Sequence, residues 1–454
     1  MPATNFAETP VLRRTMAALL LAVAASPSVG AQQQVASATR AAGESRAAPT
    51  FYADVLPILQ ENCQACHQPE GLNMGGMVAP MSLVTYEEAR PWAPMIARAV
   101  AEGRMPPWSA AEMHRGTFTE ERILTDEEKA TILAWAESGA PAGNAADAPP
   151  PPEFLTRAQA GAGGWFLGEP DLILEFAEPY CLSDEDQDIY VNLPVQITAE
   201  MLPEDRWLHS VEYRNGPAVH HIISSVGGLV PGMSPHIWEN GRGRLFRAGP
   251  RQVMFNMHFN KTPGPGTALC TNIQAGITFK EPGEVITYVT SGADLMMRGI
   301  NIPAGAESYS SSMVHEFEED VEILSFMPHM HLRGKAALYE LVYPDGRMET
   351  LLHVPKYDFN WQHTYEFREP VLAPAGSRLR FTLWWDNSET NPYNPDPTAN
   401  VRWGLPTSAE MSQGYMSYRN LDELHIVVGE PIPNNFREEP DPADGADTNG
   451  AAND

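Results

Sequence analysis

Residues 321–354 read VEILSFMPHMHLRGKAALYELVYPDGRMETLLHV, and this stretch decides the fold class. It contains short apolar runs (VEILSFM, AALYELVY, METLLHV), and a turn signal, YPDGR at 343–347, separates the last two. Short runs rich in aliphatic and aromatic residues with turn residues between them predict antiparallel strands. The same texture begins near residue 160 and continues through SRLRFTLWW at 377–385. We therefore expect two all-β antiparallel sandwiches, jelly-roll-like, over residues 165–292 and 293–433.

Residues 51–143 have a different pattern, which predicts an all-α domain. FYADVLPILQENC, at 51–63, places its apolar residues at helical spacing. LTDEEKATILAWAESGA, at 124–140, is amphipathic, with Thr125 as the expected N-cap and Gly139 as the expected stop. Linkers are expected at 32–50 and, rich in proline, at 144–164. Residues 434–454 are acidic and read as a disordered tail.

Composition and the N-terminus indicate an exported, acidic protein. The 454 residues carry a formal net charge of −28, which argues against nucleic-acid binding. Arg13 and Arg14 precede an apolar stretch over 16–25, and small residues then lead to Ala31. This order is typical of a cleaved signal peptide over 1–31, because the apolar stretch is short for a membrane anchor. We expect no stable membrane span, and a periplasmic or secreted location.

Four cysteines fall into two groups. NCQACHQ, at 62–68, has the C-x-x-C-H order. Two thiols at this spacing can attach to the vinyl groups of a haem while His67 ligates its iron, so Cys63, Cys66 and His67 predict one covalently attached haem c. The alternatives are a thioredoxin-like redox pair or half of a zinc site. Cys181 and Cys270 are then left either as one disulfide, which export favours, or as two buried thiols.

The second axial ligand of such a haem must come from another loop. AEGRMPPWS, at 101–109, places Met105 in a proline-stiffened loop between the helical stretches. This loop resembles the GxMPPW loop of a group of bacterial c-type cytochrome domains, in which the methionine is the axial ligand. The resemblance implies Met105 as the ligand in this chain. The other methionines weighed for this role are Met74, Met77, Met81, Met95 and Met113.

Three groups of histidines stand out beyond the haem motif. AVHHII contains His220 and His221, FNMHFN contains His258, and PHMH contains His329 and His331. Imidazoles on strands suit copper or zinc. Residues i and i+2 of a strand face the same side, so His329 and His331 can converge. Neighbours face opposite sides, so His220 and His221 can share a metal only if a bulge or a change of ring nitrogen re-aims one of them.

The order of these groups resembles the copper type II, ascorbate-dependent monooxygenases, the family of peptidylglycine α-hydroxylating monooxygenase and dopamine β-monooxygenase. It is most similar to their bacterial relatives, over about 165–430. The stretches that carry the resemblance are PHMHLRGK, YPDG, VPKYDFNWQ, DNSETNPYNPDP and WGLPTSAEM. The resemblance implies two copper ions. His220, His221 and His258 would hold an electron-storing copper. The oxygen-activating copper would be held by His329, His331 and Met411, which form the catalytic set. Met416, five residues further on, would not be a ligand.

This reading predicts a copper- and haem c-dependent monooxygenase that hydroxylates a C–H bond of an unknown small organic substrate with O₂. Electrons are expected to pass from the haem to the three-histidine copper and then to the second copper. The donor would be a periplasmic cytochrome, a quinol-linked chain or a small reductant such as ascorbate. Two alternatives stay open: a copper and haem dehydrogenase that passes substrate electrons out through the haem, and a non-enzymatic electron carrier.

The other polar residues of interest receive structural or open roles. Arg333 is left open between orienting a neighbouring group, binding a polar substrate and lying at the surface. Asp386 and Asn387 belong to a loop read as structural. The histidines assigned structural roles are His209, His236, His315, His353, His363 and His425.

Overall fold

The structure is a computed structural model that describes residues 48–69, 79–152, 165–433 and Phe436, apart from 215, 217, 231, 232, 234 and 240. The expected signal peptide at 1–31, most of the first linker, and the expected tail apart from Phe436 lie outside the described residues. Residues 48–454 belong to one compact unit. No helix in the described part of the chain has the length and apolarity needed to cross a membrane.

The first described segment is helical, as expected from its periodicity. Its elements are the π-helix η1 (Phe51–Val55), α1 (Leu56–Asn62), α2 (Tyr86–Ala89), α3 (Ala93–Ala101), α4 (Asp126–Glu137) and the 3₁₀ turns η2 (Arg90–Trp92), η3 (Glu112–His114) and η4 (Ala145–Asp147). Thr125 caps α4 in a capping box with Glu128, which satisfies backbone donors at its start. Gly139, with φ of +87°, follows the end of the helix. Both predicted boundaries of α4 are therefore confirmed.

Residues 172–279 form two antiparallel sheets that share one core. The first sheet contains β1 (Leu172–Glu175), β12 (Gln274–Phe279), β4 (Arg206–Arg214) and β7 (His236–Ile237) in that order, with β9 (Leu245–Phe246) paired to β4. The second contains β3 (Asp188–Ile197), β10 (Arg251–Asn260), β5 (Val219–Ser224) and β6 (Gly227–Leu229). Residues from both sheets, among them Ile277 and Phe255, are fully buried in one cluster. This arrangement is consistent with the β-sandwich expected here.

Residues 291–420 repeat this design with two further antiparallel sheets. One contains β15 (Ser291–Met296), β24 (Gln413–Asn420), β18 (Val321–His329) and β21 (Tyr365–Ala373). The other contains β17 (Tyr309–Glu316), β22 (Arg378–Trp385), β19 (Gly334–Val342) and β20 (Met348–Val354). Phe326 of the first stacks on Tyr339 of the second, with ring centroids 4.2 Å apart. Contacts of this kind across two sheets are the core of a sandwich.

The YPDGR stretch forms the turn between β19 and β20. Tyr343 N–H donates to Arg347 O at 2.8 Å, and Gly346 N–H donates to Tyr343 O at 2.9 Å. Gly346 has φ of +86°, a conformation that only glycine adopts at little cost. The turn that the sequence predicts at YPDGR is therefore confirmed.

Four short strand pairs complete the described elements. They are β2 (Tyr180–Leu182) with β11 (Leu269–Thr271), β8 (Arg242–Gly243) with β14 (Tyr288–Val289), β13 (Val285–Ile286) with β25 (Ile426–Val427), and β16 (Asn301–Ile302) with β23 (Val401–Arg402). In the first pair Cys181 lies opposite Cys270, and the two form a disulfide. The disulfide alternative of the sequence analysis is thus the one found.

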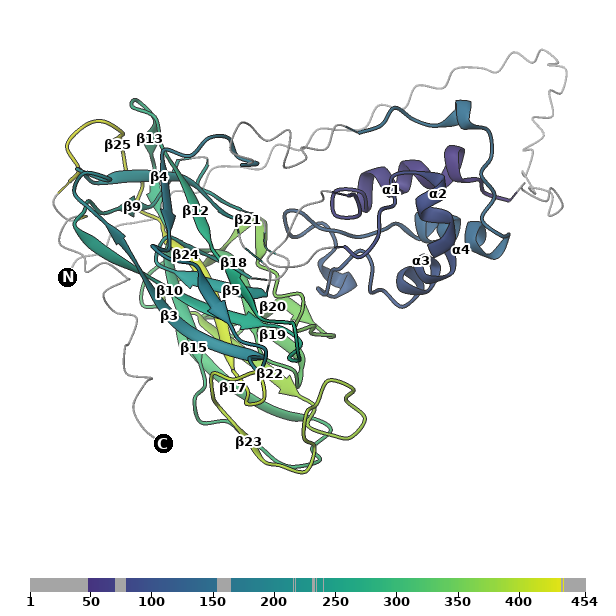
Figure 1. Ribbon diagram of the computed structural model, residues 1–454. Helices are drawn as coiled ribbons and strands as arrows, with labels where there is room; N and C mark the ends of the chain where they lie inside the picture. Colours follow the sequence, from purple (N-terminus) through teal and green to yellow (C-terminus); the bar gives the residue numbers. More distant parts are fainter. Residues whose placement is uncertain are drawn as a thin grey trace, which may run out of the picture. The chain divides into compact units, whose positions relative to one another are not determined.

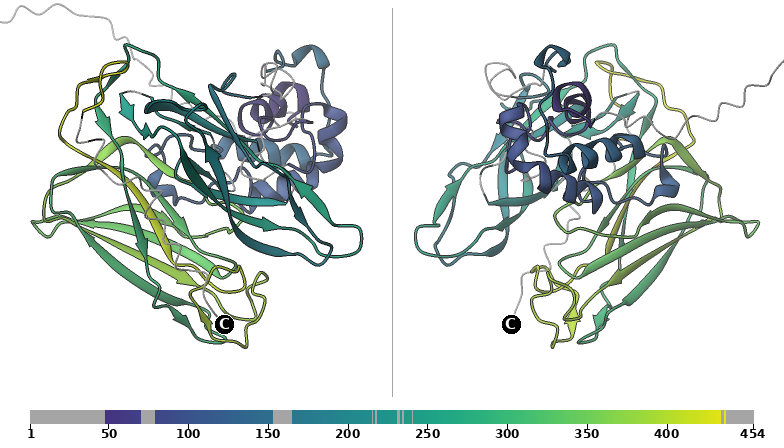
Figure 2. Two further views of the ribbon diagram at one scale, coloured as in Figure 1. Left: turned by 60° about the vertical axis from the view of Figure 1, so that its left-hand side comes forward. Right: turned by 90° about the vertical axis from the view of Figure 1, so that its right-hand side faces the viewer.

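The segment between α3 and α4 packs on the second pair of sheets. Phe118 forms a β-bridge with Phe367 and is completely buried in the core of that pair. Ala111 N–H donates to His353 O, and Thr119 N–H donates to Glu366 O, each at 2.8 Å. Figures 1 and 2 show the helices in purple to blue and the strands in teal to yellow, so the change of texture in the sequence is a change of structure.

Candidate metal centre

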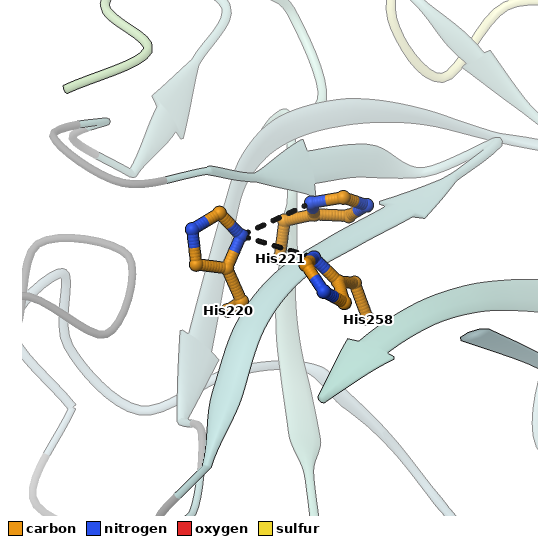
Figure 3. Close-up of side chains that lie close together, drawn as sticks. All are labelled: His220, His221 and His258. Atoms are coloured by element: carbon orange, nitrogen blue, oxygen red, sulfur yellow. Dashed lines mark hydrogen bonds between the residues drawn. The ribbon is translucent and has the colours of Figure 1, made fainter. Parts of the chain in front are cut away.

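A β-bulge brings His220, His221 and His258 together. His258 of β10 lies directly opposite His221 of β5, but the next residue, Phe259, lies opposite Val219. His220 is therefore the extra residue on its strand, and a bulge re-aims such a residue. Two neighbouring histidines on one strand thus face the same point, together with the third from the adjacent strand (Figure 3). This is the condition that the sequence analysis set for a shared metal.

The ring nitrogens that converge are the Nδ1 atoms. His220 Nδ1 lies 3.4 Å from His221 Nδ1 and 3.1 Å from His258 Nδ1. The three side chains can each offer a ligand atom, all within 4.8 Å of one another. Burial lowers the pKa of His220 to about 3 and that of His221 well below its ordinary value. These two imidazoles are therefore neutral at pH 7 and keep a lone pair for an ion.

Groups on both sides hold the His258 ring in place. Its Nε2–H donates to Asp188 Oδ1 at 2.5 Å, which leaves Nδ1 as the nitrogen with the lone pair. Tyr190, directly opposite on β3, stacks on the same ring with centroids 4.0 Å apart. Burial acts to raise the pKa of Asp188, but hydrogen bonds from His258 and Thr407 outweigh it and hold that pKa well below the ordinary range. The carboxylate is therefore charged and a strong acceptor for the imidazole N–H.

The second set consists of His329 at the end of β18, His331 just beyond it, and Met411 ahead of β24. His329 Nε2 lies 3.2 Å from Met411 Sδ, and all three side chains are buried. Met416 instead packs in the core of the second pair of sheets, away from this role. The structure therefore places Met411 against His329, and the ring of His329 makes an edge contact with that of His331 at 5.6 Å between centroids.

Both imidazoles of this set have Nδ1 occupied by a hydrogen bond, which leaves Nε2 as the nitrogen with the lone pair. His329 Nδ1–H donates to Gln362 Oε1 at 2.9 Å, and His331 Nδ1–H donates to Ala409 O at 3.3 Å. Burial lowers the pKa of His329 to about 4 and of His331 to about 3, so each ring carries only the Nδ1 proton at pH 7. In the part of the chain that the structure describes, His331 Nε2 is buried and has no hydrogen-bond partner. Its lone pair is therefore available to a metal ion.

The backbone around these ligands is held by Glu410 and Arg333. Glu410 accepts from His331 N–H at 2.8 Å and from Arg333 N–H at 2.7 Å. Burial raises the pKa of Glu410 to about 8. Arg333 is 1% exposed and donates to Asn387 Oδ1 and Ser408 O. The arginine therefore orients neighbouring groups, and its surface alternative is excluded. Asn387, which also donates to Pro303 O and Ala399 O, is structural as expected.

The two ligand sets adjoin. The rings of His221 and His329 make an edge contact with centroids 6.3 Å apart. Phe359 stacks on His220 at 4.6 Å and meets His331 edge-on at 5.9 Å. A cavity of about 570 Å³ is lined by His221 and His329, and also by the two histidines His236 and His363, which were assigned structural roles. A cavity of this size beside both sets has room for a small organic molecule.

The C-x-x-C-H motif lies at the end of α1. His67 N–H donates to Cys63 O at 2.9 Å, and His67 Nδ1–H donates to Met81 O at 3.2 Å, which leaves Nε2 for an iron. Neither Cys63 nor Cys66 is in a disulfide. Burial raises the pKa of Cys63 to about 12 and also raises that of Cys66, against the opposing charge of Arg122. Burial therefore favours the protonated thiol at both positions.

The axial ligand expected from another loop stays a prediction. Met105 follows α3, is half-buried, and its N–H donates to Ala99 O at 3.2 Å. Among the other candidates, Met74 and Met77 lie outside the described residues. Met81 packs against the core of the helical segment, which agrees with a packing role.

Sequence reasoning missed several residues that surround the ligands. Gln362 and Phe359 lie in VPKYDFNWQ, and Glu410 lies in TSAEM, but these stretches were used only for the resemblance. Asp188 was not singled out, because its contacts to His258 and Thr407 are distant in sequence. A polar residue at the start of a strand next to a histidine-bearing strand is the only local signal for it.

The comparisons with known proteins add no assignment. No protein-family model and no curated protein matches the chain. The infectious bursal disease virus VP2 subviral particle matches with 8% identity over 56% of this chain and 72% of that chain, at a TM-score of 0.17. PBCV-1 VP54, fitted into a reconstruction of the virophage Sputnik, matches with 9% identity over 57% of this chain and 97% of that chain, at a TM-score of 0.20. A Paenibacillus xanthan lyase matches with 11% identity over 54% of this chain and 24% of that chain, at a TM-score of 0.16. Scores this low carry no argument.

Proposed function

We propose that this chain is an exported monooxygenase that uses two copper ions and one haem c to hydroxylate a C–H bond of a small organic substrate with O₂. The proposal includes an N-terminal cytochrome c domain and two jelly-roll-like copper domains. The observation that carries it is the pair of adjoining ligand sets with different donors, three Nδ1 atoms in one and two Nε2 atoms with a thioether in the other.

The two donor sets suit different tasks. Three imidazoles hold copper in both of its common oxidation states, whereas a thioether favours Cu(I). Two imidazoles and one sulfur leave coordination positions open, as a reactive metal site needs. When bound, copper would supply O₂ activation and one-electron chemistry that side chains lack, and haem would supply one-electron carriage.

Hydrogen bonds and burial orient the ligand nitrogens of both sets without a bound ion. Gln362 and Ala409 O keep a proton on the Nδ1 atoms of His329 and His331, so the lone pair of each ring is on Nε2, and that of His329 faces the thioether. Asp188 does the opposite for His258 and frees its Nδ1. Burial keeps most of the imidazoles neutral and limits water around them. The cavity beside His221 and His329 supports the binding of a substrate next to both sets.

The haem part of the proposal rests on Cys63, Cys66 and His67. Two thiols at the C-x-x-C spacing, with a histidine whose Nδ1 is already bonded, suit covalent attachment and axial ligation. Met105 as the other axial ligand, a periplasmic electron donor, and electron flow from the haem to the three-histidine set are further parts of the proposal. Reverse flow, in a dehydrogenase, is the alternative.

Metal content and the fate of oxygen test the proposal together. Protein produced with haem attachment machinery is expected to contain one haem c and to bind two copper ions per chain. With ¹⁸O₂, a reductant and candidate substrates, the label is expected in the organic product. Label found only in water, with substrate oxidised, would identify a dehydrogenase. Zinc alone, or a single copper per chain, would refute the two-site arrangement.

A further inference from the structure

We propose that Asp188 is a positioning residue that couples the two ligand sets, an inference that rests on the proposed copper sites. Its side chain is shared between the two strand-rich segments. Oδ1 accepts from His258 Nε2–H at 2.5 Å. Oδ2 accepts from Thr407 N–H at 3.0 Å and from the Thr407 hydroxyl. Thr407 belongs to the loop that leads to Glu410 and Met411, so one carboxylate joins a ligand of one set to the loop of the other.

The first half of this bridge fixes the donor atom of His258. A neutral imidazole has one N–H and one lone pair, and a carboxylate at Nε2 holds the proton there. Nδ1 is then free to face His220 and His221. A metal ion on Nδ1 makes the remote N–H more acidic, so the bond to Asp188 becomes stronger when the three-histidine set is loaded. The ion therefore restrains the carboxylate as well as the ring.

The second half of the bridge fixes the loop that carries the thioether. Residues 404–411 contribute Thr407, Ser408 O, Ala409 O, Glu410 and Met411 to the contacts around the second set. The loop is anchored at one end to His331 and Arg333 through Glu410. Asp188 anchors it near Thr407. Since Met411 lies four residues beyond Thr407, the position of Sδ depends on both anchors.

The two halves together give a thermodynamic coupling. If an ion at the first set restrains Asp188, it also restrains the loop that places Met411 and raises the affinity of the second set. By linkage, an ion at the second set raises the affinity of the first by the same factor. The coupling uses one continuous chain of hydrogen bonds, His258 to Asp188 to Thr407. No change of protonation is needed.

The test measures Cu(I) binding rather than turnover. In a His220→Ala/His221→Ala background the first set is disabled, yet His258 and Asp188 are retained, so Cu(I) reports on the second set. Affinity is measured by competition with a chromophoric chelator, and the copper–sulfur contribution from Met411 is measured by X-ray absorption. Asp188→Ala is expected to weaken Cu(I) binding in this background on the order of tenfold and to diminish the sulfur contribution, because it loosens the loop of Met411. The coupling itself is measured by comparison: with all histidines present the second set is expected to bind Cu(I) on the order of tenfold more tightly than in this background, and Asp188→Ala is expected to remove that difference.

Two milder variants keep the test informative if Asp188→Ala does not fold. Asp188→Asn retains an oxygen for His258 but turns an NH₂ group toward the Thr407 donors. Thr407→Val removes only the hydroxyl. Both are expected to weaken Cu(I) binding, and the double variant is expected to be no worse than Asp188→Asn, because the two residues act through one contact. Thr398→Val is the matched control, since Thr398 donates in the same way to Asp396 within one loop.

In the chain with all histidines present, Asp188→Ala is also expected to lower copper affinity at the first set by 10- to 100-fold, about the usual effect of removing such a partner. Its Cu(II) electron paramagnetic resonance spectrum should change, while that of Thr407→Val should not.

Wild-type Cu(I) affinity and sulfur contribution in the Asp188 variants would overturn the coupling, even if ¹⁸O₂ labels the product. Unlabelled product with the coupling present would overturn the proposed function alone. A wild-type chain that takes up no copper would overturn both.

Discussion

Replacing Gln362 by leucine should damage the second ligand set without touching any ligand. Gln362 is completely buried, and its Oε1 accepts from His329 Nδ1–H at 2.9 Å. Leucine has a similar volume and no acceptor. The proton of His329 then has no reason to stay on Nδ1, and its transfer to Nε2 would cover the lone pair that faces Met411. Methionine would be a poor replacement here, because it would add a second thioether.

The magnitude follows from the two roles of this hydrogen bond. Leaving a buried donor without a partner costs about 1–3 kcal/mol of folding free energy. Removing a group that orients a metal-binding imidazole typically costs roughly 10- to 100-fold in metal affinity. We therefore expect Gln362→Leu to unfold at lower urea concentration and to bind Cu(I) at the second set roughly 10- to 100-fold more weakly. The side chain also donates to Phe359 O at 3.0 Å, so part of the lost stability comes from that bond.

Two measurements separate these effects. Urea unfolding of the copper-free protein gives the folding cost, and chelator competition gives the Cu(I) affinity. Gln274→Leu is the control, because Gln274 also loses one hydrogen bond, to Glu175, at a position remote from the ligands. It is expected to change neither copper affinity nor the copper–sulfur signal. Wild-type Cu(I) affinity in Gln362→Leu would refute the assignment of Nε2 as the ligand atom of His329.

Three further changes test other parts of the structure. Met411→Leu should abolish the copper–sulfur signal and weaken Cu(I) binding, whereas Met416→Leu should leave both unchanged; X-ray absorption distinguishes them. Burial, with Arg244 and Arg242, lowers the pKa of His236 to about 4, so the unfolded chain binds a proton that the folded chain does not as pH falls from 6.5 to 4. His236 alone should lower the free energy of unfolding by up to about 3 kcal/mol over this window, and the urea-unfolding profile of His236→Gln should be flatter against pH by that amount. Phe118→Ala should cost about 3–5 kcal/mol of folding free energy by urea unfolding, because this ring is fully buried between the α3–α4 segment and the second pair of sheets.

Local chemistry explains what the sequence predicts correctly about the fold. The ends of α4 depend on a cap at Thr125 and a glycine at Gly139, both visible in a few residues. The turn at 343–347 likewise depends on Gly346. The alternating texture after residue 160 predicts strands because successive side chains of a strand face opposite sides. The pairing of β13 with β25 has no such local signal, since their residues are more than a hundred positions apart.

The residues of the candidate site likewise fall into those that the sequence indicates and those that only the tertiary contacts identify. The histidine groups could be picked out from their spacing, and Met411 from the resemblance that their order carries. The bulge that makes His220 usable was identified as a condition, but its place in the β5–β10 ladder depends on tertiary pairing. Asp188 and Gln362 could not be predicted, because their roles depend on contacts to His258 and His329 across the fold. An Asp or Gln has many ordinary roles at the surface, and only burial against an imidazole distinguishes these two.

The surroundings of His331 agree with the metal-ligand role that we propose for it. Its Nδ1–H and backbone N–H are both satisfied, by Ala409 O and Glu410, and its pKa is lowered to about 3 by burial. The hydrogen bonds therefore leave Nε2 as the nitrogen with the lone pair, and among the described residues this buried atom has no hydrogen-bond partner. A packing role would be met better by an apolar side chain, since a buried polar atom without a partner costs about 1–3 kcal/mol. A lone pair fixed in this way, next to a histidine that contacts the Met411 sulfur, would suit a soft metal ion, because the ion would satisfy a buried atom that has no other partner.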